Sequence, residues 1–369
     1  MDNRDVATIL KDGIQLHTNK DFEGAIVKYN QAIELNPTLA AAFHNRGNAH
    51  LALRKPELAL QDYNQAIELN PTLAAAFHNR GNAHLALRKL ELAIQDYNQA
   101  IARNPKDAMA FFSRGLAFLT HNKIERAICD FESAISLRHG YSDAFFNRGL
   151  AFLKHNQIDA AISDFHEVAR LEPMSGRACL GLGRAFCRAR RLKQSRDHLE
   201  NALQYLTEEI DVRLAVSALG DTALPRLWRG QTLRDLALLE PVPTFITPGR
   251  RKNYLEKSLS DFSEALALDP LLVEATVERG YTHLAFGEVE RARQDLVSAR
   301  HSNPQRTAPL RRLFCESNIV TTLLAITQSP PRYFKSYVRY NLYCLTPLAL
   351  PHQTFLLRLH QRLSWNLSR

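Results

Sequence analysis

The sequence has little of what a secreted or membrane-embedded protein needs. It holds only 5 cysteines among 369 residues, and none form a C-x-x-C pair, which favours a reducing, cytoplasmic compartment. The longest uncharged stretch, 340–357, contains Pro347 and Pro351 and is too polar and too broken to cross a bilayer. Charge appears within the first five residues, unlike the pattern of a secretory signal. We therefore expect an intracellular protein without a transmembrane span.

Motifs for catalysis and cofactor binding are missing as well. The sequence has no G-x-x-x-x-G-K, no H-E-x-x-H and no G-x-S-x-G. Its 14 histidines mostly recur with an internal repeat, which is not the distribution of a metal cluster. We predict that the protein is not an enzyme, and we expect neither a cofactor nor a metal.

What the sequence does have is repetition. Segments 37–70 and 71–104 differ at only four positions. The same 34-residue frame extends over 3–36, 105–138, 139–172 and 173–206, and it returns at 270–303. Each unit contains two segments of helical apolar periodicity, separated in the second unit by Lys55 and Pro56. One such helix pair cannot bury its own apolar face, so stability must come from stacked neighbours.

A 34-residue period with these residues at fixed offsets resembles the tetratricopeptide repeat (TPR). The matching series are Gly13, Gly47, Gly81, Gly115, Gly149, Gly183 and Gly280; Ala25, Ala59, Ala93, Ala127, Ala161 and Ala292; and Pro37, Pro71, Pro105, Pro173 and Pro304. Pentatricopeptide arrays, the family most easily confused with this one, have a period of 35 residues, whereas the period here is 34. The resemblance implies an all-α solenoid of helix-turn-helix units wound into a right-handed superhelix.

The predicted organisation follows from this frame. Residues 3–206 form six tandem units, and 270–303 form another. Between them, residues 207–269 are predicted to be a degenerate unit with a Pro-rich insertion at about 240–252. This insertion is either a solvent-exposed loop without a function or a functional loop. Residues 304–369 are predicted to be a basic, helical segment that caps the array.

Two charged positions vary together between the units. An arginine precedes the glycine in most units, and an aspartate follows on the second predicted helix, as with Arg114 and Asp130. In the first unit the signs are exchanged, with Asp12 and Lys28 at the same places. A functional acid would not exchange sign with its partner. We therefore predict that the two positions touch across each helix pair and form a structural ion pair.

The TPR resemblance also implies that the first helix of each unit lines a concave groove. Asparagine offers a donor and an acceptor on one short side chain, which suits the backbone of an extended peptide. The alternative is that these asparagines merely belong to a duplicated consensus. The predicted groove comprises an asparagine ladder with one serine (Asn45, Asn79, Ser113, Asn147), a flanking aromatic wall (His44, His78, Phe112, Phe146) and further polar residues (Asn48, Asn82, Lys154, Arg184).

These features predict a non-catalytic adaptor or scaffold for protein–protein interaction. The partner is expected to bind through an extended segment. In TPR domains that bind chaperones, a set of Lys, Arg and Asn residues forms a carboxylate clamp that holds the C-terminal carboxylate of the chaperone. Here Leu10, Ile14, Met109 and Ser113 stand where that pattern has Lys, Asn, Lys and Arg. Binding of a chaperone C-terminal tail is therefore disfavoured.

The basic end of the chain supports an alternative function. Residues 300–369 carry ten Lys and Arg against one acid, Glu316, which accounts for the whole net charge of +9. Basic residues alternate with aromatic ones over 332–343, a pattern that can bind nucleic acid. Tyr333, Tyr337 and Tyr340 also share one helical face, as a capping helix requires. We predict capping, with nucleic-acid or acidic-surface binding as the alternative.

Overall fold

The computed structural model describes residues 3–216, 222–240 and 250–302. Within these ranges the chain forms helices and no strand, so the predicted all-α class is confirmed. The chain divides into two compact units, Met1–Ala151 and Phe152–Arg369, each with its own internal packing.

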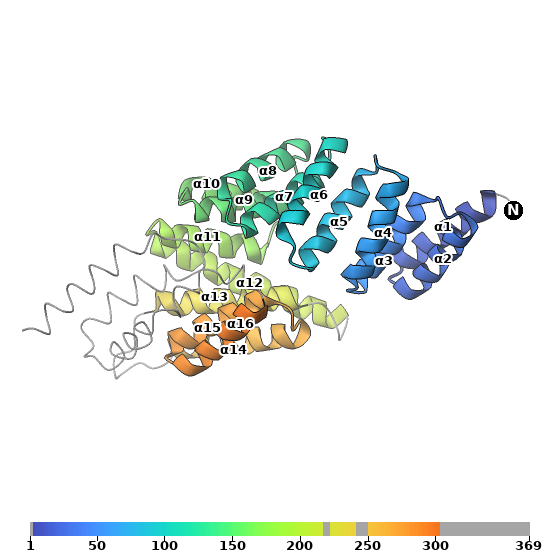
Figure 1. The fold of residues 1–369 in the computed structure, drawn as a ribbon. Helices are drawn as coiled ribbons and strands as arrows, with labels where there is room; N and C mark the ends of the chain where they lie inside the picture. Colours follow the sequence, from blue (N-terminus) through green and yellow to red (C-terminus); the bar gives the residue numbers. More distant parts are fainter. Residues whose placement is uncertain (1–2, 217–221, 241–249, 303–369) are drawn as a thin grey trace, which may run out of the picture. The chain divides into compact units, whose positions relative to one another are not determined.

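The first unit consists of helices that contact their neighbours in chain order (Figure 1). Each predicted repeat supplies a first and a second helix, joined by a short turn. The helices are α1 (Asn3–Thr18), α2 (Phe22–Leu35), α3 (Ala40–Ala52), α4 (Pro56–Leu69), α5 (Ala74–Ala86), α6 (Leu90–Arg103), α7 (Ala108–Thr120), α8 (Ile124–Leu137) and α9 (Ser142–Lys154), the last of which ends in the second unit.

The second unit continues the helix pairs with longer and less regular members. Its helices are α10 (Ile158–Leu171), α11 (Gly176–Arg188), α12 (Leu192–Val216), α13 (Ala223–Leu239), α14 (Arg250–Leu268), α15 (Val273–Phe286) and α16 (Val289–Ser302). Helix α12 continues beyond the predicted repeat boundary at 206, and α14 begins inside the predicted insertion. The rest of that insertion, 241–249, and the predicted capping segment, 304–369, lie outside the described residues.

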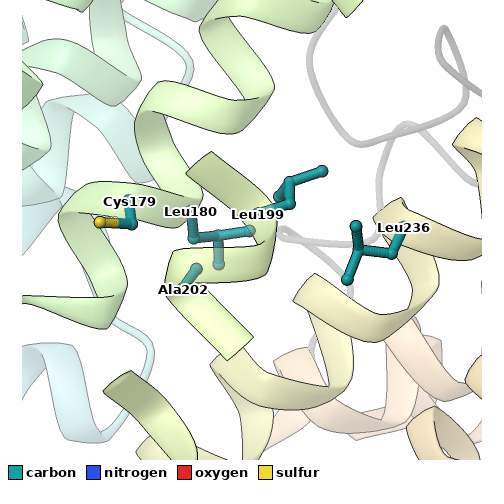
Figure 2. Packing of buried hydrophobic residues seen from close by; sticks show 5 residues of the cluster. All are labelled: Cys179, Leu180, Leu199, Ala202 and Leu236. Atoms are coloured by element: carbon teal, nitrogen blue, oxygen red, sulfur yellow. The ribbon is translucent and has the colours of Figure 1, made fainter. Parts of the chain in front are cut away.

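A buried cluster shows how the degenerate repeat joins its neighbour within the second unit. Cys179 and Leu180 of α11 pack with Leu199 and Ala202 of α12 and with Leu236 of α13 (Figure 2). Leu236 is fully buried, and α13 contacts both α11 and α12. The repeat that departs most from the sequence pattern is therefore also stacked through apolar contacts, although leucines take part here in place of the tyrosine of the regular repeats.

The recurring glycine is required by a close approach of the two helices in a repeat. A Cβ atom added to Gly81 would lie 2.7 Å from Cε1 of Tyr97, closer than side chains normally approach. Tyr97 is fully buried and clusters with Leu90, Ala93 and Ala117, the last of which belongs to the next repeat. The aromatic ring on the second helix thus fills the space that the glycine leaves and also joins successive repeats.

The turns between the paired helices adopt the left-handed backbone region, although most do not use glycine there. Residues with positive φ at these turns include Arg54, Arg88 and Asn122, with φ values of 57° to 60°. Gly287 holds the corresponding turn between α15 and α16. Side chains other than Asn and Gly are disfavoured in this region, so the arginine turns are locally strained.

The predicted contact between arginine and aspartate is confirmed. Arg114 donates from Nε to Asp130 Oδ2 at 2.8 Å and from Nη2 to Asp130 Oδ1 at 2.7 Å, and its Nη1 reaches Asn98 Oδ1 of the preceding repeat at 2.8 Å. Each such arginine therefore links its own helix pair and, in most repeats, the one before. Equivalent ion pairs are Arg46–Asp62, Arg80–Asp96, Arg229–Asp261 and Arg279–Asp295.

The exchanged pair of the first repeat behaves differently. The two positions are adjacent, because a Cβ added to Gly13 would lie 3.2 Å from Cβ of Lys28. Yet Asp12 and Lys28 are not among the ion pairs that the described residues form, so the expectation that they pair is not met. Lysine offers one flexible ammonium in place of a planar fork with several donors, and it cannot reproduce the bidentate arrangement.

Candidate functional site

The predicted site residues of the first unit lie on its first helices, and a network of side-chain hydrogen bonds joins three of these helices. Asn79 of α5 is at its centre. Its Nδ2 donates to Asn48 Oδ1 at 2.9 Å and contacts His44 Nε2 at 3.0 Å, and both partners belong to α3. Its Oδ1 lies 3.1 Å from His78 Nδ1. The Asn79 amide is thus already bonded on both sides by the protein itself.

The network continues into α7 through His78. The Nε2 atom of His78 lies 3.0 Å from Ser113 Oγ. Nδ1 of the same ring faces the acceptor Oδ1 of Asn79 and therefore donates to it; in the neutral ring Nε2 then accepts from the serine hydroxyl. Burial lowers the pKa of both His44 and His78, which also favours neutral rings. We call His44, Asn48, His78, Asn79, Asn82 and Ser113 the amide network; Asn82 joins it through a long 3.5 Å contact with Asn79.

The remaining members of the predicted ladder are not equivalent to Asn79. Asn147 donates from Nδ2 to the Asp143 carbonyl of its own helix at 2.8 Å. Asn45 directly follows His44 on α3 and is not part of this network. The structure therefore brings Asn79 and Ser113 together through His78, whereas Asn147 makes a separate bond within α9.

The predicted aromatic wall packs onto second-helix rings. The ring centroids of His44 and Tyr63 are 6.0 Å apart, and those of His78 and Tyr97 are 5.6 Å apart. The ring centroid of Phe112 is 5.9 Å from that of Phe131 on α8 and 4.9 Å from that of Tyr141, which precedes α9. These wall residues are half-buried, as is Phe146 on α9, so each presents only part of its surface to a ligand.

Two predicted site residues, Lys154 and Arg184, lie in the second unit, and Arg184 is held by an ion pair. Its Nε donates to Asp235 Oδ2 at 2.7 Å. Asp235 also accepts from the almost fully buried Arg234, which in turn pairs with Glu278. Sequence reasoning missed this buried charge network. The sequence signal that could have indicated it was Glu278, which is the only acid at the position two before the glycine among the seven clear repeats.

Other cations near Arg184 are also used internally. Over 176–196, Arg177 pairs with Glu172, Arg196 pairs with Glu240, and Arg188 donates to the Leu153 carbonyl. Much of the positive charge in this stretch is therefore committed to structure and does not form an open basic surface.

Neither a metal centre nor a membrane span emerges in the described part of the chain. No group of three or more His, Cys, Asp or Glu side chains there could hold a metal ion. None of the helices described is both long and apolar enough to cross a membrane.

Comparison with known proteins identifies the repeats. Family models for the tetratricopeptide repeat match residues 40–73, 78–138 and 146–207, and a further TPR repeat model matches residues 15–53. The chain is a tetratricopeptide repeat protein. Proteins of this kind are protein–protein interaction scaffolds and are generally non-catalytic, and the predicted fold class, an all-α TPR solenoid, is confirmed. No curated protein matches this TPR chain.

Solved structures of similar proteins include three of interest. The crystal structure of PilW, a widely conserved type IV pilus biogenesis factor, is 14% identical, covers 54% of this chain and 92% of its own, and has a TM-score of 0.50. MamA is 26% identical and covers 43% and 94%, with a TM-score of 0.41. YrrB, described as a TPR protein with an unusual peptide-binding site, is 21% identical and covers 48% and 91%, with a TM-score of 0.43. PilW supports the TPR fold alone.

Proposed function

We propose that this TPR protein binds an extended segment of a partner protein on the first helices of its N-terminal repeats. The observation that carries the proposal is the amide network, because it joins the first helices α3, α5 and α7 into one continuous polar surface. Half-buried His44, His78 and Phe112 lie within or beside it and supply apolar contact area.

The charge of this surface favours recognition of a peptide main chain. Each of the helices α3, α5 and α7 carries one arginine, Arg46, Arg80 or Arg114, and each of these is paired with an aspartate. His44 and His78 are neutral for the reasons given above. A surface without an unpaired cation has little attraction for a terminal carboxylate, which is the physical reason to disfavour a chaperone tail.

The test uses a short peptide selected on the full-length protein from a displayed random library, hereafter the selected peptide. Asn45→Ala and Phe112→Ala should each weaken its binding, with the lost hydrogen-bonding site of Asn45 contributing about 0.5–1.5 kcal/mol. Asn79→Ala is less informative, because its internal hydrogen bonds make a loss of stability expected as well.

The controls are Gln61→Ala and Gln95→Ala, which remove exposed amides from the second helices of the second and third repeats. They should leave the affinity unchanged. If the inner-helix variants bind the selected peptide as tightly as these controls do, the first helices are not the binding surface. The alternative through the basic C-terminal segment concerns residues outside the described ranges.

A further inference from the structure

Two buried tyrosines control the orientation of two asparagines in the amide network. Tyr63 and Tyr97 are fully buried, and each lies under the first helix of its own repeat. The Tyr63 hydroxyl donates to Asn48 Oδ1 at 2.9 Å, and the Tyr97 hydroxyl donates to Asn82 Oδ1 at 2.7 Å. Burial raises the pKa of both phenols, so each hydroxyl keeps its proton and acts as a donor.

The two positions are associated in the two near-identical repeats. An asparagine directly after the recurring glycine occurs only where the buried ring is tyrosine, as in Asn48 and Asn82. The next repeat has Leu116 with Phe131 at the same two places. Tyr29 in the first repeat stands opposite Ile14, so tyrosine is tolerated without asparagine, but in this chain the asparagine does not occur without tyrosine.

This bonding leaves the asparagines with donors facing a ligand. Asn48 Oδ1 accepts from Tyr63 and from Asn79, which uses both of its lone pairs. No residue in the described part of the chain accepts a hydrogen bond from the Asn48 Nδ2 atom. Asn82 has its oxygen held by Tyr97, and its Nδ2 makes only the 3.5 Å contact with Asn79. Both amides therefore keep at least one N–H available.

We infer that Tyr63 and Tyr97 are positioning residues that fix Asn48 and Asn82 as a pair of hydrogen-bond donors one repeat apart. This inference rests on the proposed function and narrows it, because the ligand must then present acceptors to the pair. Because the arginines of these helices are all paired with aspartates, an anionic ligand is not favoured, and those acceptors are main-chain carbonyls of an extended protein segment. Asn48 and Asn82 therefore present only N–H donors to the peptide, and they bind its main-chain carbonyl groups and not its N–H groups.

The decisive variant is Asn48→Asp combined with Asn82→Asp. An aspartate at 48 can still accept from Tyr63 and Asn79, and one at 82 can still accept from Tyr97. The substitutions replace the outward donors by charged acceptors, and at 82 they also remove the long N–H contact with Asn79. The inference expects affinity for the selected peptide to fall by more than about tenfold, since carboxylates would face carbonyl oxygens. Wild-type or tighter binding by this variant would overturn it.

The positioning role has its own variants. Tyr63→Phe with Tyr97→Phe removes only the hydroxyls, and phenylalanine already fits this place at Phe131. Affinity for the selected peptide should fall about threefold to tenfold with helicity unchanged. Phe131→Tyr is the matched control, since Leu116 offers no amide to orient, and it should leave affinity unchanged.

A measurement without ligand separates this inference from the proposed function. In the free protein, the side-chain amide NMR resonances of Asn48 and Asn82 should shift and broaden in the Tyr→Phe double variant, because the amides are no longer held. Unchanged resonances would overturn the positioning role even if the peptide binds nearby. Conversely, if Asn45→Ala and Phe112→Ala do not affect binding while the resonances respond as expected, the proposed function fails and the tyrosine–asparagine coupling stands.

Discussion

Removing one partner of the Arg114–Asp130 pair should destabilise the protein far more than removing both. Asp130 is 5% exposed, so Arg114→Met strands a carboxylate almost completely out of water. Breaking a buried pair in this way costs about 3–5 kcal/mol. Asp130→Leu should fall at the lower end, since Arg114 keeps Asn98 and is partly exposed. The double variant leaves no uncompensated charge and should recover most of the loss.

The assay is a double-mutant cycle from urea unfolding followed by circular dichroism. The Arg114 guanidinium carbon lies 5.5 Å and 5.8 Å from the ring centroids of Phe111 and Phe118, so Arg114→Met also removes these contacts. The same loss occurs in the double variant and cancels in the cycle, which therefore reports on the coupling between the two charges. We expect a coupling energy of about 2 kcal/mol or more. Additivity of the two single variants within about 0.5 kcal/mol would refute the reasoning, because it would mean that the two side chains do not depend on each other.

Three further predictions concern the repeat framework. Arg88→Asn should raise stability by up to about 1 kcal/mol, because Asn tolerates the left-handed turn better, and an unchanged urea midpoint would argue against strain there. Gly81→Ala should cost about 1–3 kcal/mol by overpacking, whereas Gly140→Ala, which meets nothing within 4 Å, should be nearly neutral; equal midpoints would contradict this. The lowered pKa values of His44 and His78 mean that the folded state favours their neutral rings. Their contribution to the free energy of unfolding is therefore complete above about pH 6.5 and is lost as the pH falls below that value. The urea midpoint should be lower at pH 5.5 than at pH 7.5, and the difference should be smaller when both histidines are replaced by Gln.

The framework could be predicted from the sequence because it depends on contacts within one repeat. The 34-residue period located the helix pairs, and the recurring glycine reflects a close contact with the second helix of its own repeat, made by an aromatic ring in most units and by Leu199 or Leu296 in two. The Arg114–Asp130 contact was also accessible, since its two positions vary together. The third partner, Asn98, was not, because it belongs to the preceding repeat and its role depends on how neighbours stack.

The candidate site was predicted less completely for the same reason. Asn79 was expected to face a peptide with its amide uncommitted, but its partners Asn48 and His44 come from the preceding repeat. The charge network of Arg234 and Glu278 was hidden because the degenerate repeat has lost the period that would have aligned them. Comparison of equivalent positions between repeats indicates which residues face the groove, but it does not indicate which of these residues hydrogen-bond to each other across neighbouring repeats.

Near-identical repeats therefore do not produce identical surfaces. His44 and His78 occupy the same position in two units that differ at only four places, yet His44 bonds to Asn79 and His78 bonds to Ser113. The difference originates one repeat further on, where serine replaces asparagine. A side chain whose hydrogen bonds reach the next unit takes its orientation from that unit's sequence. Along this array, a ligand displaced by one repeat would meet a different set of donors and acceptors, even where the sequence beneath it is repeated.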